Sequence, residues 1–482
     1  MKRILAVLIT LCVCLLPHAA AAEKVDTLRV GLYYGSGALG AASVSNVDGA
    51  GFTIGCYNGR SFQSRTSISN TSLRVSASGG AVTVSDAKSG AALYTGSDSN
   101  LALRPNGSQA KCQDTAYRGD LVFAASGGAL TVMNYVSLDD YAKGVLPYEM
   151  TPSWSLEALK AQAVCTRSYA LGSLNKHQSR YGFDVCDTTD CQVYKGTSLS
   201  TTQSDSAVDA TSGEYLTYNG EIATGYFSSS DGGATEDAVN VWGTEIAYLK
   251  GVPDPYEDLD NASNGRWKKT LSASEVASKL RSAGYSIGSV SNVAITKRTS
   301  MDNVNEVTVT DTSGSKVILK REACRTVFGL NSIRYSINGE RGGDGTPVQT
   351  NTTVMTPTPS NSSTSASSSP AELPAPLPSS APLDSSLPST ATTASSSGSY
   401  ISGTSAAGPS PRFAVNLIGA TGRALEQYLS NVYGAASSFT FAGTGWGHSV
   451  GMSQYGAKGM AEKGFSYQDI LHYYFTDIQI SK

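Results

Sequence analysis

The sequence predicts an α+β protein in which mixed sheets pack with helices after a β-rich N-terminal region. Residues from about 25 to 110 hold short, β-prone apolar runs between Gly, Ser and Asn. An apolar pattern with helical spacing covers 155–174, and further strand patterns lie between 290 and 320. Runs of strands and helices that do not alternate regularly are typical of an α+β fold.

The composition argues against nucleic acid as a partner. The 482 residues include 36 Lys and Arg against 39 Asp and Glu, which gives a formal charge of −3 at pH 7. Such a chain has no basic field to neutralise a phosphate backbone. Only 16% of the residues are charged, while 49 Gly and 25 Tyr leave a neutral, hydroxyl-rich surface that suits glycans.

The first 22 residues have the pattern of a signal peptide. Lys2 and Arg3 precede an apolar run, Ile4–Leu16, and small residues at 19–22 provide a cleavage site. The apolar run is too short to span a bilayer as a helix, so we expect cleavage and export to the cell envelope. Outside the cytosol, the cysteines of the mature chain could form disulfides whose pairing the sequence does not fix.

The most regular helical pattern covers residues 155–174. Apolar residues recur there three and four positions apart, and Ser155 stands where an N-terminal cap belongs. Glu157 lies near the positive end of the helix dipole. These signals predict a helix from Ser155 to Leu174.

Shorter elements follow along the chain. Asn219-Gly220 lies between two β-prone runs and favours a type I′ hairpin, because both positions need positive φ. A capping box of Ser272 and Glu275 predicts a helix that ends at Gly284. The other expected elements are three strands and a last helix capped by Ser466 with Asp469, at 290–296, 304–310, 316–320 and 466–475.

One acidic side chain is a candidate for catalysis. Glu149 lies among apolar and aromatic residues in the segment 141–150, just before the long helix. Desolvation there would raise its pKa and leave it able to donate a proton near neutral pH, as a general acid must. The alternative is a structural carboxylate that caps or pairs with the following helix.

Two cysteines five positions apart follow the long helix. Cys186 and Cys191 could bind zinc together with His177 or Asp190. In an exported chain they could also form a local disulfide or remain free thiols. Cys165 stands mid-helix in apolar surroundings, which raise the pKa of a thiol, so no cysteine nucleophile is expected there.

A glycine-rich segment, residues 443–457, could bind sugar. Trp446 offers a flat apolar face on which a pyranose can stack, and His448, Gln454 and Tyr455 can form hydrogen bonds. The segment lacks the ending of a phosphate-binding loop, and the chain has no His-Glu-x-x-His motif. A structural role for the histidine is the alternative.

A series of ordered motifs resembles the SpoIID/LytB family, which contains stage II sporulation protein D and amidase enhancers. The motifs are Gly144–Met150, Glu157–Ala170, Cys186–Tyr194, Tyr226–Glu236, Val241–Gly243, Phe328–Ser332 and Gly445–Ala457. Between the last two, residues 346–411 carry no formal charge except Glu372 and Asp384 and should be disordered. The end of the chain should then fold back onto the body.

The resemblance divides the chain into five parts. These are a signal peptide, a β-rich region, the first part of a SpoIID/LytB-like domain, a disordered Ser/Thr/Pro-rich insertion and the C-terminal part of that domain, at 1–22, 23–115, 116–340, 341–412 and 413–482.

The resemblance implies lytic transglycosylation of peptidoglycan, in cell-wall remodelling or sporulation, with Glu149 as the catalytic residue. The acid would protonate the oxygen of the MurNAc–GlcNAc bond and then, as a base, deprotonate the C6 hydroxyl that closes on C1. No cofactor is required, although a structural zinc is possible, and the implied partners are glycan strands and a cell-wall amidase or other wall hydrolases. The implied substrate-binding residues are Gln162, Arg167, Tyr169, Gln192, Tyr194, Ser229, Trp446, His448, Gln454 and Tyr455, and the implied metal ligands are Cys186, Cys191 and His177.

The chain departs from the family pattern at two positions. Asp190 stands where the family commonly has His, so zinc would need Asp190 or His177 as a substitute ligand. Ser449 stands where the family has Gly, which is harmless if φ there is negative. The competing interpretation is a non-catalytic glycan-binding enhancer of an N-acetylmuramoyl-L-alanine amidase, and a third is a wall-associated structural protein.

Overall fold

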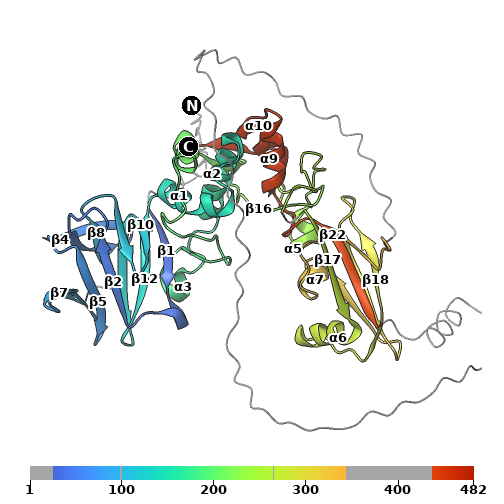
Figure 1. Ribbon diagram of the computed structural model, residues 1–482, viewed down its shortest axis with the longest axis horizontal. Helices are drawn as coiled ribbons and strands as arrows, with labels where there is room; N and C mark the ends of the chain where they lie inside the picture. Colours follow the sequence, from blue (N-terminus) through green and yellow to red (C-terminus); the bar gives the residue numbers. More distant parts are fainter. Residues whose placement is uncertain (1–24, 26, 98–99, 264, 344–436) are drawn as a thin grey trace, which may run out of the picture. The chain divides into compact units, whose positions relative to one another are not determined.

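The computed structural model describes residues 25, 27–97, 100–263, 265–343 and 437–482 (Figure 1). The expected signal peptide, nearly all of the Ser/Thr/Pro-rich insertion and the residues just after it lie outside the described residues. Strands dominate the N-terminal part, and helices pack with mixed sheets after it. The prediction of an α+β fold is therefore confirmed.

The N-terminal region consists of two sheets that share one hydrophobic core. Val75 and Val84 of one sheet belong to the same buried cluster as Leu103 and Phe123 of the other. The first sheet has the order β13 (Val185–Cys186), β1 (Leu28–Tyr33), β12 (Ala129–Val136), β11 (Asp120–Ser126), β8 (Leu101–Pro105), β3 (Phe52–Asn58) and β4 (Ser61–Ile68). The second has the order β10 (Thr115–Arg118), β9 (Gln109–Cys112), β2 (Ala41–Asn46), β5 (Ser72–Ser78), β6 (Ala81–Asp86) and β7 (Ala92–Gly96).

These sheets do not end at residue 115, where the sequence placed the boundary. Strand β12 pairs with β1 along its length, and β11 pairs with β8. The β-rich region therefore extends to Val136, because the strands that close it come last in sequence. A short 3-10 helix, Gly35–Gly37, follows β1.

A buried helix, α2 (Leu156–Gly172), is central to the part of the fold that follows. It contacts α1 (Leu138–Glu149), α4 (Thr202–Ala210), α9 (Gln454–Glu462) and α10 (Tyr467–Tyr474), so most of its residues are buried. The prediction of this helix is confirmed, although Ser155 makes no side-chain capping bond. A one-turn helix, α3 (Gln178–Tyr181), lies between α2 and β13.

Helix α1 was not predicted from sequence. Pro147 lies inside it and has no N–H to donate to the carbonyl of Lys143. Ser200 Oγ donates to that carbonyl at 3.3 Å and so replaces the missing helical bond. Ser137 caps the start of the helix, where its Oγ accepts from Asp140 N at 3.1 Å. The helix ends at Glu149, which places the candidate acid at a helix terminus.

The C-terminal segment completes three sheets that begin much earlier in the chain. Strand β22 (Ser438–Thr444) lies between β17 (Arg266–Ser272) and β21 (Tyr335–Ile337). Strand β23 (Met452–Ser453) runs parallel to β16 (Phe227–Ser228), and β24 (Gln479–Ser481) pairs with β14 (Tyr215–Tyr218), which also pairs with β15 (Glu221–Ile222). The end of the chain thus folds back, as expected. The remaining elements are α5 (Ala238–Trp242), α6 (Ala273–Ser282), β18 (Val290–Arg298), β19 (Val304–Asp311), β20 (Lys316–Lys320) and α7 (Ala323–Thr326).

Local sequence signals located several of these elements. Asn219 and Gly220, with φ of 52° and 83°, join β14 to β15 as the hairpin prediction required. Capping boxes form at Ser272 before α6 and at Ser466 before α10. The three strands expected after α6 correspond to β18, β19 and β20.

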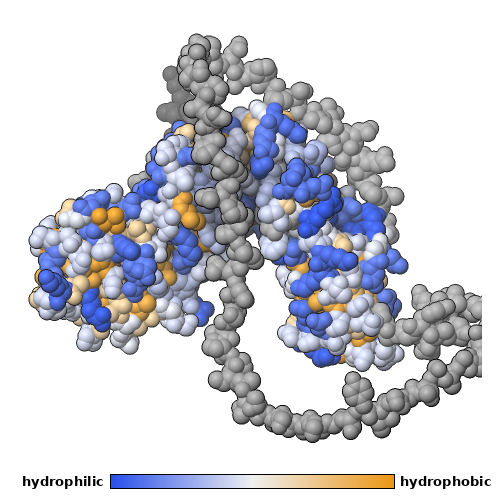
Figure 2. Space-filling view, in the orientation of Figure 1, coloured by the Kyte–Doolittle hydropathy of each residue, from blue (hydrophilic) through white to orange (hydrophobic). Residues whose placement is uncertain are grey.

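The surface of the described residues is mixed in polarity. Figure 2 shows hydrophilic and near-neutral residues over much of the visible face, with hydrophobic residues in small groups. Within the described ranges, no helix combines the length and apolarity that a membrane crossing would need.

Candidate active site

Glu149 contacts a glutamine from another helix, and that glutamine in turn contacts a second one. Gln454 Nε2, at the start of α9, donates a hydrogen bond to Glu149 Oε2 at 3.3 Å and lies 3.4 Å from Gln162 Oε1 on α2. Gln162 is fully buried, and Gln454 is nearly so. Helices α1, α2 and α9 therefore bring together three of the residues that the sequence singled out.

The carboxyl of Glu149 is partly buried and carries a perturbed pKa. Burial is the main cause, and it raises the pKa; hydrogen bonds from Gln454 and from the backbone N–H of Val193 offset part of this effect. No charged neighbour is among the causes of the shift. Glu149 therefore keeps its proton to a higher pH than an exposed glutamate, which is the direction that the sequence predicts.

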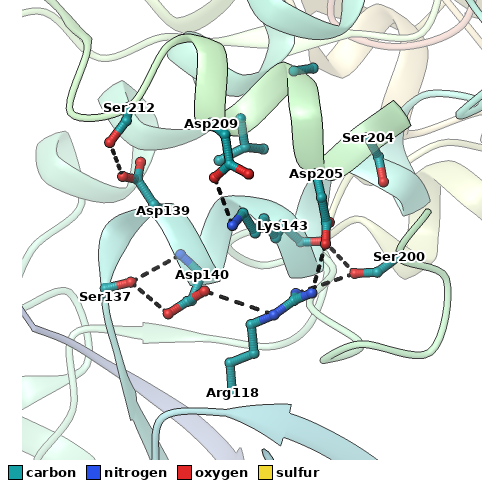
Figure 3. Close-up of polar contacts among 12 residues, drawn as sticks. Arg118, Ser137, Asp139, Asp140, Lys143, Ser200, Ser204, Asp205, Asp209 and Ser212 are labelled. Atoms are coloured by element: carbon teal, nitrogen blue, oxygen red, sulfur yellow. Dashed lines mark hydrogen bonds and ion pairs between the residues drawn. The ribbon is translucent and has the colours of Figure 1, made fainter. Parts of the chain in front are cut away.

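Several charged residues in the earlier turns of α1, before Glu149, form ion pairs with residues outside the helix (Figure 3). Arg118 lies 3.8 Å from Asp140 of α1 and 2.7 Å from Asp205 of α4. Lys143 Nζ contacts Asp209 Oδ1 of α4 at 2.7 Å. These contacts hold α1 against α4 and engage the cations of this region with other carboxylates.

Arg167 lies near the start of α1 and not beside Glu149, and its role in substrate binding stays a prediction. Its Nε donates to Asp139 Oδ1 at 2.5 Å, and its other nitrogens donate to Val208 O and Thr211 Oγ1. Asp139 precedes Glu149 by about 15 Å along a helix. Arg167 also lines a cavity of about 950 Å³ at this end of α1. It is a buried residue that joins α1, α2 and α4.

Tyr194 and Gln192 are buried as well, and their contacts with sugar stay a prediction. Tyr194 is 1% exposed and donates from its hydroxyl to Asn134 Oδ1 at 2.7 Å. Gln192 is 2% exposed, and its Oε1 accepts from Tyr141 at 3.2 Å. Both side chains support the loop 186–194 from inside, and the loop reaches Glu149 through the backbone of Val193.

Trp446 presents the most open aromatic face among the predicted residues. Its side chain is 45% exposed, while its backbone pairs with Ser230 through hydrogen bonds of 2.8 and 3.2 Å. Tyr455 is more constrained, because its ring packs on Trp154 and its hydroxyl contacts Ser263 Oγ at 2.9 Å. The carbonyl of Ser229 accepts from the backbone N–H of Tyr455 at 3.1 Å.

His448 has a neutral ring that accepts a hydrogen bond at Nδ1 and carries its proton on Nε2. Val450 N–H donates to its Nδ1 at 3.0 Å, so the ring proton lies on Nε2. Burial lowers the pKa of His448 to about 4, and the charge of Arg325 adds to this effect. The ring packs edge-on to Trp242 and Tyr226, and Tyr226 in turn contacts Tyr169. His448 is thus not a cation at neutral pH.

Ser449 does not meet the condition under which it would replace glycine harmlessly. Its φ is 62°, in the left-handed region that favours glycine, and the neighbouring Gly447 and Gly451 also have positive φ. The side chain is fully buried, and its Oγ has no hydrogen-bond partner. The loop therefore carries backbone strain and an unsatisfied hydroxyl at this position.

Four residues are close enough to share one metal ion. Candidate ligand atoms of His177, Cys186, Asp190 and Cys191 all lie within 4.8 Å of one another, and His177 Nε2 is 3.3 Å from Cys191 Sγ. Two sulfurs, one imidazole and one carboxylate form a set that fits tetrahedral zinc. The hydrogen bond between the two cysteines lowers the pKa of Cys186 and raises the pKa of Cys191, so the pair readily loses one of its two protons. None of the six described cysteines is in a disulfide.

Comparison with known proteins shows a match to one family. Residues 126–218, which contain α1, α2 and Glu149, match the family model described as SpoIID, stage II sporulation protein. These residues therefore carry a SpoIID domain, and the chain is similar to proteins of the SpoIID/LytB family. Gln454, which completes the site from the C-terminal segment, lies outside this match, as does Trp446.

Three curated relatives resemble the chain. An uncharacterized protein of Brachyspira hyodysenteriae is 40% identical over 36% of this chain and 45% of its own length. The amidase enhancer of Bacillus subtilis is 31% identical over 69% of this chain and 39% of its own length. Stage II sporulation protein D of Bacillus subtilis is 31% identical over 45% of this chain and 64% of its own length. The chain therefore spans less than two thirds of each of these relatives.

Two contacts of the site were missed from sequence. The backbone donor at Val193 has no side-chain signature, so no pattern could have revealed it. Asp139, the partner of Arg167, was detectable in principle, because Ser137 and Asp140 form the start signal of a helix. That signal would have placed Asp139 in the first turn of α1.

Proposed function

We propose that this chain is an exported lytic transglycosylase of peptidoglycan in which Glu149 acts first as acid and then as base. The observation that carries the proposal is the partly buried Glu149 carboxyl, whose pKa is raised by desolvation and which accepts from Gln454 at 3.3 Å. Such a carboxyl can hold a proton for donation near neutral pH.

The reaction needs one carboxyl and no water. Protonated Glu149 gives its proton to the glycosidic oxygen between MurNAc and GlcNAc as the bond to C1 breaks. The resulting carboxylate takes the proton of the MurNAc C6 hydroxyl, whose oxygen bonds to C1 and forms a 1,6-anhydro end. Glu149 regains its proton, and the two sugar chains are separated without hydrolysis.

Neighbouring residues would bind and orient the glycan. Gln454 holds the Glu149 carboxyl, Trp446 offers its exposed ring for stacking, and His448 can donate from Nε2 to a sugar oxygen. A zinc ion held by His177, Cys186, Asp190 and Cys191 would fix the loop whose backbone contacts Glu149 at Val193.

The names of the relatives support a role in cell-wall remodelling or sporulation. Stage II sporulation protein D and an amidase enhancer both match the chain, and the pattern of the first 22 residues supports export to the cell envelope. The proposed partners are glycan strands and a wall amidase, and the charge of −3 argues against nucleic acid.

Product analysis tests the proposal. The purified chain is incubated with glycan strands, with and without stem peptides, and the products are analysed by mass spectrometry. The expected products carry 1,6-anhydroMurNAc ends. Reducing ends produced with uptake of water, or no cleavage of either substrate, would contradict transglycosylation.

A second candidate function is a glycan-binding enhancer of an N-acetylmuramoyl-L-alanine amidase. It is favoured by coverage, because the match to the amidase enhancer spans 69% of this chain while the match to stage II sporulation protein D spans 45%. The enhancer would bind glycan strands, yield no anhydro ends and increase the rate of an added amidase. Glu149→Gln should not abolish that stimulation, because the enhancer would not use Glu149 as a catalyst.

A further inference from the structure

Three carboxylates lie together outside the Glu149 site. Asp231 is fully buried, Asp254 is 4% exposed, and Glu257 is partly buried. One oxygen of each lies within 4.8 Å of the other two. Among the described residues, the ion pairs of the fold involve other acids, and none joins these three to Lys, Arg or His.

Some carboxylate oxygens of the cluster have no hydrogen-bond partner. Gly233 N donates to Asp231 Oδ1 at 2.8 Å, and Gly232 N donates to Glu257 Oε2 at 3.0 Å. The second oxygens, Asp231 Oδ2 and Glu257 Oε1, are buried and have no hydrogen-bond partner. Asp254 is better satisfied, because its Oδ2 accepts from the hydroxyl of Tyr474 at 2.6 Å.

A neutral side chain provides an independent sign of a missing ligand. Ser230 is fully buried, and its Oγ has no hydrogen-bond partner. The hydroxyl lies close enough to Glu257 to lower the pKa of that carboxyl, as a hydrogen-bond donor does, and no group donates to its oxygen. Three buried oxygens, from Asp231, Glu257 and Ser230, therefore lie together with free lone pairs.

Two kinds of occupant could satisfy these oxygens. Buried carboxylates without a cation are costly, and protons on the acids would reduce that cost. Protons would also let the carboxyls and the serine hydroxyl form hydrogen bonds with one another. A hard divalent cation would use all the oxygens at once, because Ca²⁺ takes six to eight oxygen ligands, carboxylates above all.

The spacing suits such an ion. Two oxygens on opposite sides of Ca²⁺ lie about 4.8 Å apart, since each bond is about 2.4 Å long, and the candidate atoms here lie within 4.8 Å of one another. We propose that Asp231, Asp254 and Glu257, with the hydroxyl of Ser230, form a Ca²⁺ site. Neither the family match nor the relatives' names refer to such a site.

The ion would join segments that are far apart in sequence. Asp254 contacts Tyr474 of α10, and Gly456 of α9 lies so close that an added Cβ would be 2.0 Å from Asp254 Oδ2. Ser230 pairs through its backbone with Trp446. The ion would thus fasten the 230–233 turn to the C-terminal segment that carries Trp446 and Gln454, whatever reaction that segment serves.

The proposed site differs chemically from the His177, Cys186, Asp190 and Cys191 cluster. That cluster offers sulfur and imidazole, which favour zinc, whereas the acidic cluster offers oxygen alone. Ca²⁺ added to the chain should therefore bind at the acidic cluster. The cysteine cluster should not contribute to the change in melting temperature that Ca²⁺ causes.

Thermal unfolding of the full chain tests the proposal. Metals are removed with a chelator, and the melting temperature is measured with and without about 10 mM CaCl₂. For a dissociation constant of about 0.1 mM, Ca²⁺ should raise the melting temperature by about 4 °C. No difference between the two conditions would overturn the proposal.

Variants locate the effect. In Asp231→Asn and in Glu257→Gln the Ca²⁺-dependent shift should disappear, and without Ca²⁺ these variants should melt no lower than wild type, because a buried charge has been removed. The control is Asp258→Asn, an exposed carboxylate beside the cluster, which should keep the full shift. An undiminished shift in both cluster variants would overturn the assignment.

A direct binding measurement covers the case in which the variants do not fold. Tb³⁺ substitutes for Ca²⁺, and its luminescence is excited through nearby tyrosine, here Tyr474 at 2.6 Å from Asp254. Wild type should bind one Tb³⁺ per chain and show tyrosine-sensitised emission. Added Ca²⁺ should displace the Tb³⁺ and reduce this emission. Emission at the level of free Tb³⁺ would refute the site.

Discussion

Replacing Glu149 by glutamine separates the chemistry of this side chain from its contribution to the fold. The amide has nearly the same size as the carboxyl and keeps one oxygen that can accept a hydrogen bond. It cannot donate a proton to the glycosidic oxygen or remove one from the C6 hydroxyl. Because both proposed steps depend on the same group, Glu149→Gln should lose both.

The structure allows the two effects to be compared. The new amide NH₂ must face a position where the carboxyl accepted from Gln454 or from Val193 N–H, which costs about 1 kcal/mol. Removal of the desolvated charge stabilises the folded state by a similar amount, so the free energy of unfolding should stay within about 1 kcal/mol of wild type. General acid–base catalysis contributes about 10²–10⁴ in rate, so a loss of about 10³ corresponds to about 4 kcal/mol. The catalytic effect should therefore dominate.

The assay measures anhydro ends per unit time by mass spectrometry, together with urea denaturation of the same preparations. Glu462→Gln is the matched control, since Glu462 lies on α9 with Gln454 but is exposed and paired only with Lys458. It should keep full activity and stability. Wild-type activity in Glu149→Gln, or a loss of activity explained by unfolding, would refute the assignment of Glu149.

The raised pKa of Glu149 also fixes the sign of a pH effect on stability. The folded chain binds this proton more tightly than the unfolded chain, so Glu149 favours folding while both states are protonated. That contribution is lost as pH rises from the ordinary glutamate pKa through the raised value in the folded state. Glu149→Gln should lack this loss, so the stability difference between variant and wild type should shift in favour of the variant as pH rises.

Other measurements follow from the same contacts. Initial rates of cleavage should fall as pH rises through the raised pKa of Glu149, since the first step needs the protonated form; rates that climb steadily with pH would contradict this. Gln454→Leu should move that fall to higher pH, because it removes a hydrogen bond that stabilises the carboxylate, and a midpoint that moves down would contradict the contact. Ser449→Gly should raise the free energy of unfolding by about 1 kcal/mol in urea denaturation, because it relieves a positive φ and removes an unsatisfied hydroxyl; a less stable variant would show that neither carries a cost.

The elements predicted correctly are those whose signals are local. Asn219-Gly220 specifies its turn by backbone conformation alone, and the boxes at Ser272 and Ser466 satisfy helix ends within four residues. Helix α1 escaped prediction because Pro147 argues against a helix interior, and the compensating hydroxyl of Ser200 comes from a distant segment.

The residues of the site also divide into those with local signals in the sequence and those that depend on distant segments. Glu149 was identified from its apolar neighbours, and burial does raise its pKa. Gln454 stands 305 positions away; the glycine-rich segment and the family motifs both marked it as a sugar-binding residue, but neither placed it beside Glu149. Arg167 and Tyr194 lie in family motifs too, but their partners Asp139 and Asn134 hold them inside the fold, and a motif does not indicate which way a side chain faces.

The pairing of β22, β23 and β24 with earlier strands has a consequence for synthesis. A ribosome delivers Glu149 long before Gln454, so a growing or truncated polypeptide has the acid without its amide neighbour and with three sheets each lacking a strand. On the proposed function, the capacity to cut the wall arises only after Gln454 has been made and has reached Glu149. Unfinished copies would then be harmless to the cell that makes them.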